Sequence, residues 1–328
     1  MTEKQNIAGT ADIIIVGGGV AGLTAGIYAG RGGQKTVIFE GNFNSSVDLP
    51  GGQLMLTPEI ENFPGYNGTG WDLIEKIREQ AENHVEEIFT ENIERFTFGN
   101  AGELHQVHVE NGEVWEAKAV ILATGAVARR LNIEGEDRLY GKGVSSCATC
   151  DGSFFKDQTV AVVGGGDTAV EDALYLADIA KKVYLIHRRD TLRTDSPESR
   201  ALAAKENVQF LWNTKVLSVE GEDKVASATL ASTVAEVVSG NVQATGEATL
   251  PLDGLFVAIG HDPASKLVHG HPVEVENTGY ILAKETETNV PGLFVAGDVA
   301  DSKYRQAITA AATGAQAAMN AIKYSKVS

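Results

Sequence analysis

The sequence contains very little cysteine: two residues in 328, close together in the run Cys147-Ala148-Thr149-Cys150. A zinc site would need two further ligands, and neither a second CxxC nor a pair of histidines lies nearby. A structural disulfide across so short a loop would remove little entropy from the unfolded chain. Because the two-residue spacing lets one turn of backbone bring the sulfurs within bonding range, the pair predicts a redox-active dithiol and no metal site.

The sequence is also short of positive charge, with 27 Lys and Arg against 44 Asp and Glu and a formal net charge of −17. This balance argues against general binding to nucleic acid or to an anionic membrane.

A long uninterrupted hydrophobic run is missing as well. The stretch from Ala11 to Gly30 has Asp12 as its only charge, but glycines interrupt it and no basic segment precedes it. Together with the scarcity of cysteine, these features predict a soluble, cytoplasmic protein.

No Gly/Ser-rich or Pro-rich linker divides the chain, but a glycine fingerprint occurs twice. The copies are Gly17-x-Gly19-x-x-Gly22, after the apolar run 13–16, and Gly164-x-Gly166-x-x-Ala169, after the apolar run 160–163. In such a turn the first glycine makes the tight bend, the second lets the backbone approach a pyrophosphate, and the third small residue lets helix pack on strand. One copy alone would be weak, but two copies in strand–turn–helix context predict two dinucleotide sites.

The two copies differ where the next strand ends, at the position that meets the adenosine ribose. Glu40 lies 23 residues after Gly17, and His187-Arg188-Arg189 begins 23 residues after Gly164. A glutamate accepts hydrogen bonds from ribose hydroxyls and repels a 2′-phosphate, whereas arginines bind that phosphate. The first copy is therefore expected to hold a dinucleotide with a free ribose and the second NADP, unless the arginines are merely a solvated surface pair.

A chain with these two sites and a dithiol needs a carrier between hydride chemistry and thiol chemistry. Flavin connects the two, which makes FAD the expected occupant of the first site. Asp298 ends a third apolar run, 293–297, just before a predicted helix over 306–321. Its carboxylate could bond a ribityl hydroxyl of FAD or could serve as a plain helix cap.

The order of these motifs predicts an α/β fold with two Rossmann-like domains. Residues 1–125 and 254–328 form a discontinuous FAD-binding domain, and residues 126–253 form an inserted NADPH-binding domain that carries the CxxC. Residues 221–250 alternate as a small antiparallel meander would. The chain then crosses between domains near 125–130 and 251–256, and two crossings make a double hinge.

Several longer motifs resemble the low-molecular-weight, bacterial-type thioredoxin reductases. They are CATCDG, VAVVGGGDTAVEDALYLA, HRRDTLR and GDVADSKYRQAITAAATGAQAA in the second half, and GGGVAGLTAGIYAGR, GGQL at 51–54 and PEIENFPG at 58–65 in the first. The resemblance covers essentially the whole chain. The departures are Asp167 in place of an amide, the acidic Thr194-Asp195 after Arg193, and a slightly long loop at 45–50 with no assigned role.

The resemblance implies roles for the residues at matching positions. Cys147 would attack the disulfide of thioredoxin, Cys150 would lie against the flavin, and Asp151 would be the general acid–base residue. The residues expected to contact FAD are Gly17, Gly19, Gly22, Glu40, Gln53, Asn62, Thr124, Asp298, Arg305, Gln306 and Ala307. The residues expected to serve NADPH are Gly164, Gly166, Glu171, His187, Arg188, Arg189 and Arg193.

The activity implied is NADPH-dependent reduction of thioredoxin by a flavoprotein homodimer. One alternative is a ferredoxin-linked flavin thioredoxin reductase, although the arginines at 188, 189 and 193 argue against it because such relatives lack the phosphate clamp. A second alternative is a non-catalytic flavin redox sensor, which would explain the CxxC but not a complete NADP site.

Overall fold

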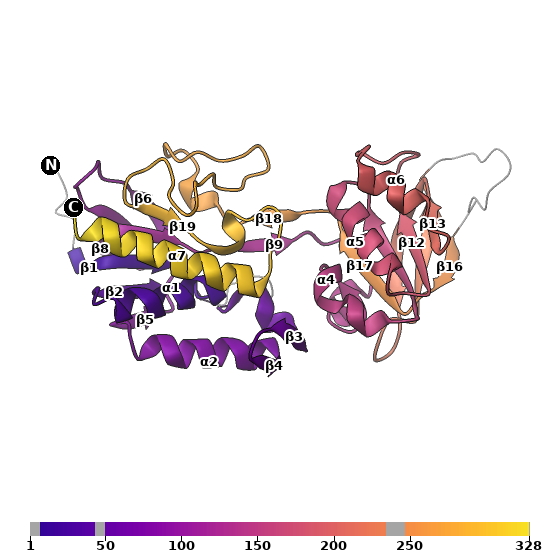
Figure 1. The fold of residues 1–328 in the computed structure, drawn as a ribbon, viewed down its shortest axis with the longest axis horizontal. Helices are drawn as coiled ribbons and strands as arrows, with labels where there is room; N and C mark the ends of the chain where they lie inside the picture. Colours follow the sequence, from indigo (N-terminus) through magenta and orange to yellow (C-terminus); the bar gives the residue numbers. More distant parts are fainter. Residues whose placement is uncertain (1–6, 43–49, 234–246, 328) are drawn as a thin grey trace. The chain divides into compact units, whose positions relative to one another are not determined.

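The computed structural model describes residues 7–42, 50–233 and 247–327, so most of the loop at 45–50 lies outside the described part of the chain. The chain forms two compact units, Met1–Val127 with Asp262–Ser328, and Ala128–His261 (Figure 1). Each unit is built on a largely parallel sheet flanked by helices, which agrees with the α/β class predicted from the two fingerprints.

The first unit contains a seven-stranded sheet in the order β5-β2-β1-β8-β7-β6, with β19 also paired to β8. The pairs β5–β2, β2–β1, β1–β8 and β8–β19 are parallel, and β8–β7 and β7–β6 are antiparallel. The strands are β1 (Ile7–Val16), β2 (Thr36–Phe39), β5 (Glu87–Phe89), β6 (Ile93–Thr97), β7 (His105–Val109), β8 (Val114–Leu122) and β19 (Leu293–Val295). The Ile/Val run of β1 is fully buried, as expected for a parallel strand covered on both faces.

Three helices belong to this unit: α1 (Val20–Arg31), α2 (Gly70–Glu82) and α7 (Ala307–Ser325). The predicted helix over 306–321 is α7, which continues four residues further. Helices α1 and α7 approach closely at Gly314, which has no side chain. A Cβ at this position would lie 2.2 Å from the carbonyl oxygen of Ala21. Shorter elements are η1 (Gly52–Leu56), β3 (Ile60–Phe63), β4 (Tyr66–Gly68), η3 (Lys266–Val268) and η4 (Gly297–Val299).

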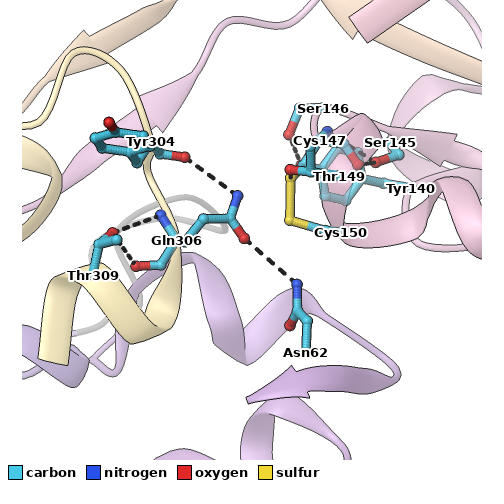
Figure 2. The surroundings of a disulfide bond; sticks show 10 residues. All are labelled: Asn62, Tyr140, Ser145, Ser146, Cys147, Thr149, Cys150, Tyr304, Gln306 and Thr309. Atoms are coloured by element: carbon cyan, nitrogen blue, oxygen red, sulfur yellow. Dashed lines mark hydrogen bonds between the residues drawn. A yellow bond between two sulfur atoms is a disulfide. The ribbon is translucent and has the colours of Figure 1, made fainter. Parts of the chain in front are cut away.

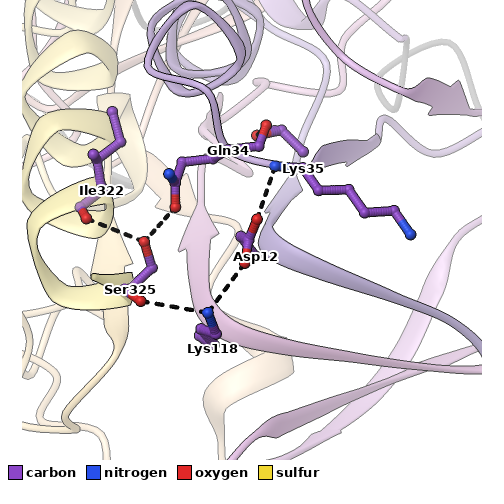
Figure 3. Close-up of polar contacts among 7 residues, drawn as sticks. Asp12, Gln34, Lys35, Lys118, Ile322 and Ser325 are labelled. Carbon is purple, nitrogen blue, oxygen red and sulfur yellow. Dashed lines mark hydrogen bonds and ion pairs between the residues drawn. The ribbon is translucent and has the colours of Figure 1, made fainter. Parts of the chain in front are cut away.

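A polar network joins the end of α7 to the sheet of the first unit (Figure 3). Asp12 accepts from the Lys35 backbone N–H at 3.0 Å and pairs with the Lys118 ammonium at 3.2 Å. Lys118 also donates to the Ser325 carbonyl oxygen at 3.5 Å, and the Ser325 hydroxyl bonds Gln34. The C-terminal helix is therefore held against β1 and β8 by residues far apart in the sequence.

The second unit contains a five-stranded parallel sheet in the order β10-β17-β11-β12-β13. Its strands are β10 (Val144–Ser145), β11 (Thr159–Gly164), β12 (Lys182–Ile186), β13 (Val208–Leu211) and β17 (Gly254–Ala258). Its helices are α3 (Glu136–Leu139), α4 (Ala148–Asp151), η2 (Gly152–Phe155), α5 (Asp167–Ala177) and α6 (Pro197–Ala203). A small antiparallel sheet is formed by β14 (Thr214–Glu220), β15 (Ser227–Ser232) and β16 (Ala248–Pro251). Its first strand precedes the range 221–250 in which a meander is predicted, and residues 234–246 of that range are not among the described residues.

The chain passes between the units at 127/128 and 261/262, through β9 (Ala126–Ala128) and β18 (His261–Pro263), which pair with each other. The Arg129 N–H donates to Gly260 at 3.0 Å, and the Ala264 N–H donates to Gly125 at 2.9 Å. The first crossing lies within the predicted range. The compact second unit ends eight residues beyond the predicted boundary at 253/254, because β17 pairs in parallel with β11 and so belongs to that unit's sheet.

Candidate active site and nucleotide-binding loops

The two cysteines are joined in a disulfide with their Cα atoms 5.3 Å apart (Figure 2). Strand β10 leads into Cys147, and the short helix α4 starts at the next residue. The Asp151 N–H then donates to the Cys147 carbonyl oxygen at 3.2 Å, so a single turn carries both cysteines and the aspartate. Both cysteines are half-buried. The close pairing predicted from the CxxC spacing is confirmed.

The Ser145 hydroxyl is bonded to the backbone of Cys147. It accepts from the Cys147 N–H at 3.0 Å and donates to the Cys147 carbonyl oxygen at 3.3 Å. Burial raises the pKa of Asp151 above the ordinary aspartate value, and the Ser145 side chain opposes that rise. A carboxyl group shifted upward beside a dithiol suits proton transfer, which is the role predicted for Asp151.

Three further hydroxyls, of Thr149, Tyr140 and Ser146, lie around the disulfide. Thr149 Oγ1 lies 3.4 Å from Cys147 Sγ, and Tyr140 bonds Ser146 with its oxygen 2.7 Å from Oγ (Figure 2). The Arg130 guanidinium stacks 3.4 Å from the centre of the Tyr140 ring. Hydroxyls next to a CxxC are visible in the sequence and could have been noted, but nothing local relates Arg130 or Tyr140 to the dithiol.

The second fingerprint forms the turn between β11 and α5. A Cβ on Gly164 would lie 2.4 Å from the Ala258 carbonyl oxygen, so no larger residue fits there. Gly166 is the N-cap of helix α5 and offers no side-chain cap, which leaves the first backbone N–H groups of the helix available to an anion. A Cβ on Gly166 would lie 3.1 Å from a guanidinium nitrogen of Arg193. The Arg193 side chain therefore lies directly beside the fingerprint turn.

The predicted phosphate-binding residues differ in exposure. Arg188, Arg189 and Arg193 are exposed, and none of them forms an ion pair with a carboxylate in the part of the chain described. His187 is instead buried against Gly165, where a Cβ would lie 2.2 Å from the imidazole. Burial lowers the pKa of His187, and the neighbouring arginines lower it further. We therefore expect a neutral imidazole that packs beneath the turn.

The acidic departure after Arg193 has a partner of its own. Asp195 forms an exposed ion pair with Arg200 of α6, with nitrogen and oxygen 2.7 Å apart. Its charge is therefore offset locally. Glu171, the other acidic residue predicted to serve NADPH, is exposed on α5.

The first fingerprint forms the turn between β1 and α1. Gly17 has φ +119°, and its Cβ would lie 2.2 Å from the Ala123 carbonyl oxygen. Gly19 is the N-cap of helix α1 and offers no side-chain cap, and the nearest atom to a Cβ on Gly19 would be 3.7 Å away. An open approach to uncapped N–H groups fits a pyrophosphate. Glu40 follows β2 with its side chain 4% exposed and paired with Arg78, a residue that the sequence did not single out.

The remaining predicted FAD contacts come from distant parts of the first unit. The Asn62 amide donates to Gln306 Oε1 at 3.5 Å across 244 residues of sequence (Figure 2). Thr124 donates to the Ala264 carbonyl oxygen at 2.7 Å. Gln53 lies in η1, and Ala307 starts α7.

The loop before α7 is organised by Asp301. Its carboxylate accepts from the backbone N–H groups of Lys303, Tyr304 and Arg305, at 2.9, 2.8 and 3.0 Å, and Arg305 adopts φ +47°. Burial, assisted by Asp301 and opposed by Arg305, raises the pKa of Asp298 to about 7. Asp298 can therefore accept or donate a hydrogen bond near neutral pH. A hydroxyl-rich ligand fits such a group.

Membrane-spanning helices and metal-binding clusters are both absent from the described residues. Within residues 7–42, 50–233 and 247–327, no helix is long and apolar enough to cross a membrane. Across the same ranges, no cluster of three or more His, Cys, Asp or Glu side chains has an arrangement that could hold a metal ion.

Comparison with known proteins places this geometry among disulfide reductases. The pyridine nucleotide-disulphide oxidoreductase family model matches residues 11–314. The chain is 44% identical to a thioredoxin reductase of Streptomyces coelicolor over 315 residues, covering 94% of this chain and 92% of that one. It is 44% identical to a thioredoxin reductase of Mycolicibacterium smegmatis over 318 residues, covering 95% and 96%. The crystal structure of thioredoxin reductase from Streptococcus pyogenes superimposes with a TM-score of 0.86 at 35% identity, covering 97% and 99%.

Proposed function

We propose that this chain, which belongs to the pyridine nucleotide-disulphide oxidoreductase family, reduces the disulfide of thioredoxin with electrons from NADPH. The observation that carries the proposal is the Cys147–Cys150 disulfide, set on one turn with Asp151 in the same unit as an arginine-flanked dinucleotide fingerprint. The family likeness and the thioredoxin reductase names of the relatives support the choice of substrate.

The unit formed by the two chain ends is proposed to bind FAD. The turn at Gly17 and Gly19 would hold the pyrophosphate, and Glu40 would accept from the ribose. A carboxylate accepts several hydrogen bonds, so the pairing of Glu40 with Arg78 leaves capacity for a hydroxyl. When bound, FAD would take a hydride from NADPH and pass two electrons to the disulfide.

The inserted unit is proposed to bind NADPH. Its fingerprint turn and the uncapped start of α5 would hold the pyrophosphate. Arg188, Arg189 and Arg193 would bind the 2′-phosphate through charge-assisted hydrogen bonds, because they are exposed beside that turn. This reading also argues against a ferredoxin-linked enzyme, which would have no use for a phosphate clamp.

The dithiol is proposed to act by exchange. Cys147, as a thiolate, attacks one sulfur of the thioredoxin disulfide, which breaks that S–S bond and forms a mixed disulfide. Cys150 then attacks the Cys147 sulfur, releases dithiol thioredoxin and restores the Cys147–Cys150 bond. Asp151 would take the proton from the attacking thiol and return it to the departing thiolate, so protons and electrons balance. A cytoplasmic location and a homodimer remain part of the proposal.

A steady-state assay tests the proposal. The purified protein, supplied with FAD, should oxidise NADPH only when thioredoxin disulfide is present, and NADH should serve poorly. A redox sensor would give no sustained NADPH consumption, and a ferredoxin-linked enzyme would need reduced ferredoxin instead. A protein that stays colourless after incubation with FAD, or that turns over without thioredoxin or another disulfide, would contradict the assignment.

A further inference from the structure

Glu40, the acid predicted to meet the ribose of FAD, lies directly beside the first fingerprint turn. A Cβ on Gly18 would lie 2.4 Å from the Glu40 Cβ and 2.8 Å from its Oε2. The Glu40 N–H donates to the Phe89 carbonyl oxygen at 2.9 Å, and Arg78 pairs with the carboxylate. Strand β5 and helix α2 thus hold this residue, and the chain that leaves it is held by a third element.

The turn after Glu40 is fastened by the side-chain amide of Asn92, which lies just before β6. The Asn42 N–H donates to Asn92 Oδ1 at 3.1 Å, and Asn92 Nδ2 donates back to Asn42 Oδ1 at 3.0 Å. The intervening Gly41 has φ +84°, and a Cβ on it would lie 2.9 Å from Asn92 Oδ1. A residue with a side chain would be strained in that conformation and would crowd the amide. Gly41 therefore lets the amide approach the turn closely.

Asn92 is itself anchored at the end of β7. Its Nδ2 also donates to Glu110 Oε2 at 3.1 Å, and the Glu110 N–H donates to the Asn92 carbonyl oxygen at 3.0 Å. A side-chain amide has two N–H donors, and both donors of Asn92 are used within the protein. The half-buried Asn92 is therefore suited to holding the turn and not to donating hydrogen bonds to a ligand.

We propose that Asn92 is a positioning residue for the adenosine end of FAD: its amide fixes the turn at Gly41 and Asn42, and so holds the Glu40 carboxylate where it would accept from the ribose. The inference rests on the proposed function only in the choice of FAD for this site. A group that is fixed in advance loses less freedom when a ligand binds, so binding is stronger. Without the amide, the turn would gain conformational freedom and Glu40 would spend less time in the binding geometry.

The test compares two ligands on the flavin-free protein by calorimetric titration. They are FAD and an FAD analogue whose adenosine ribose lacks its 2′- and 3′-hydroxyls. The wild type should bind FAD at least about tenfold more tightly, the size expected for hydrogen bonds to a charged group. Asn92→Ala should weaken FAD binding about fivefold and leave binding of the analogue unchanged to within about twofold. Asn100→Ala, at an exposed asparagine beyond the other end of β6, should change neither dissociation constant.

An exchange of donor and acceptor shows whether the hydrogen bonds of Asn92 carry the effect. Asn92→Asp keeps the size of the side chain but removes both donors and places a second carboxylate beside Glu110, so it should weaken FAD binding selectively, as Asn92→Ala does. Glu110→Gln in that background supplies a donor again, and the Asn42 amide can reverse to donate to the new carboxylate. The double variant should regain most of the preference for FAD. These two variants carry the test if Asn92→Ala fails to fold.

The proposal is overturned if Asn92→Ala weakens FAD and the analogue by the same factor, which would indicate a general loss of structure, or if it changes neither. It is also overturned if the wild type does not distinguish the two ligands, or if the double variant binds FAD no better than Asn92→Asp. The titration needs neither NADPH nor thioredoxin. A protein that binds FAD in the expected pattern but does not reduce thioredoxin would therefore contradict the proposed function and support the role of Asn92.

Discussion

The Arg78 guanidinium of α2 is paired with the Glu40 carboxylate at the end of β2, and the two side chains are 18% and 4% exposed. Glu40 is the acid predicted to meet a ribose, and it is held in place by a residue of a helix 38 positions further along the chain. Burial is the largest single influence and lowers the pKa of Arg78, but the bond to Glu40 and the charges of Glu40, Glu75 and Glu82 together outweigh it and raise that pKa.

Replacing Arg78 should therefore leave a buried carboxylate without its counter-ion. Arg78→Met is expected to lower the free energy of unfolding by about 3 kcal/mol, because removing one partner of a buried pair costs far more than the pair contributes. Urea unfolding measures this, and FAD titration should show weaker binding. Arg95→Met changes an arginine on β6 that lies outside the pair and is the matched control; an equal loss in both variants would argue against a special role for Arg78.

The exposed arginines of the second unit should determine coenzyme choice. Arg188→Ala with Arg189→Ala removes charge-assisted contacts to the 2′-phosphate, each worth about 1.5–3 kcal/mol. The KM for NADPH should rise far more than the KM for NADH, which lacks that phosphate. Steady-state kinetics with both coenzymes measure the split. Equal losses with NADPH and NADH would mean that the arginines do not read the phosphate.

The cysteines should be needed for one half of the reaction only. Cys147→Ser and Cys150→Ser should abolish reduction of thioredoxin, because exchange needs one sulfur to attack and the other to resolve. NADPH should still bleach the flavin absorbance in both variants, since the nucleotide sites lie outside the CxxC. Rapid-mixing spectra separate the two steps, and Cys150→Ser should in addition accumulate a mixed disulfide through Cys147. Turnover of thioredoxin at the wild-type rate in either variant would remove the dithiol from the mechanism.

A buried histidine should make the fold sensitive to acid. His105 is fully buried, and burial lowers its pKa below that of an exposed histidine. The unfolded chain then binds a proton at a higher pH than the folded chain, so stability is complete above about pH 6.5 and falls as pH drops below it. Urea unfolding at several pH values should show this slope, and His105→Gln should flatten it. His84→Gln, at an exposed histidine, should leave the slope unchanged.

The close contact between α1 and α7 should make Gly314 irreplaceable. Alanine favours a helix over glycine by about 1 kcal/mol, but its methyl group would meet the Ala21 carbonyl oxygen at 2.2 Å. The helices would have to separate, and overpacking of this kind costs roughly 1–3 kcal/mol. Gly314→Ala should therefore lower Tm, whereas Met319→Ala, at a half-exposed site on the same helix, should change it little. A raised Tm for Gly314→Ala would show that α7 can shift without cost.

Features of this protein that depend on local physics could be predicted from residue type and spacing. The turns at Gly17 and Gly164 need glycine because neighbouring backbone fills the space of a side chain, and the flanking apolar runs form β1 and β11 as predicted. The Cys147–Cys150 pair could be predicted for the same reason, since one turn of chain brings the sulfurs together.

The distant residues that complete these local features could not be predicted, because they are brought together by packing between separate elements. Arg78 reaches Glu40 from α2, and Asn62 meets Gln306 across 244 residues. The strand Gly254–Ala258 joins the second unit because its partner is β11, which moves the boundary away from the predicted position. The Ser145 hydroxyl bonds the backbone of Cys147, whereas the neighbouring hydroxyl of Ser146 bonds Tyr140. Contacts of this kind depend on how separate elements pack against each other, and that packing cannot be predicted from residue type and spacing along the chain.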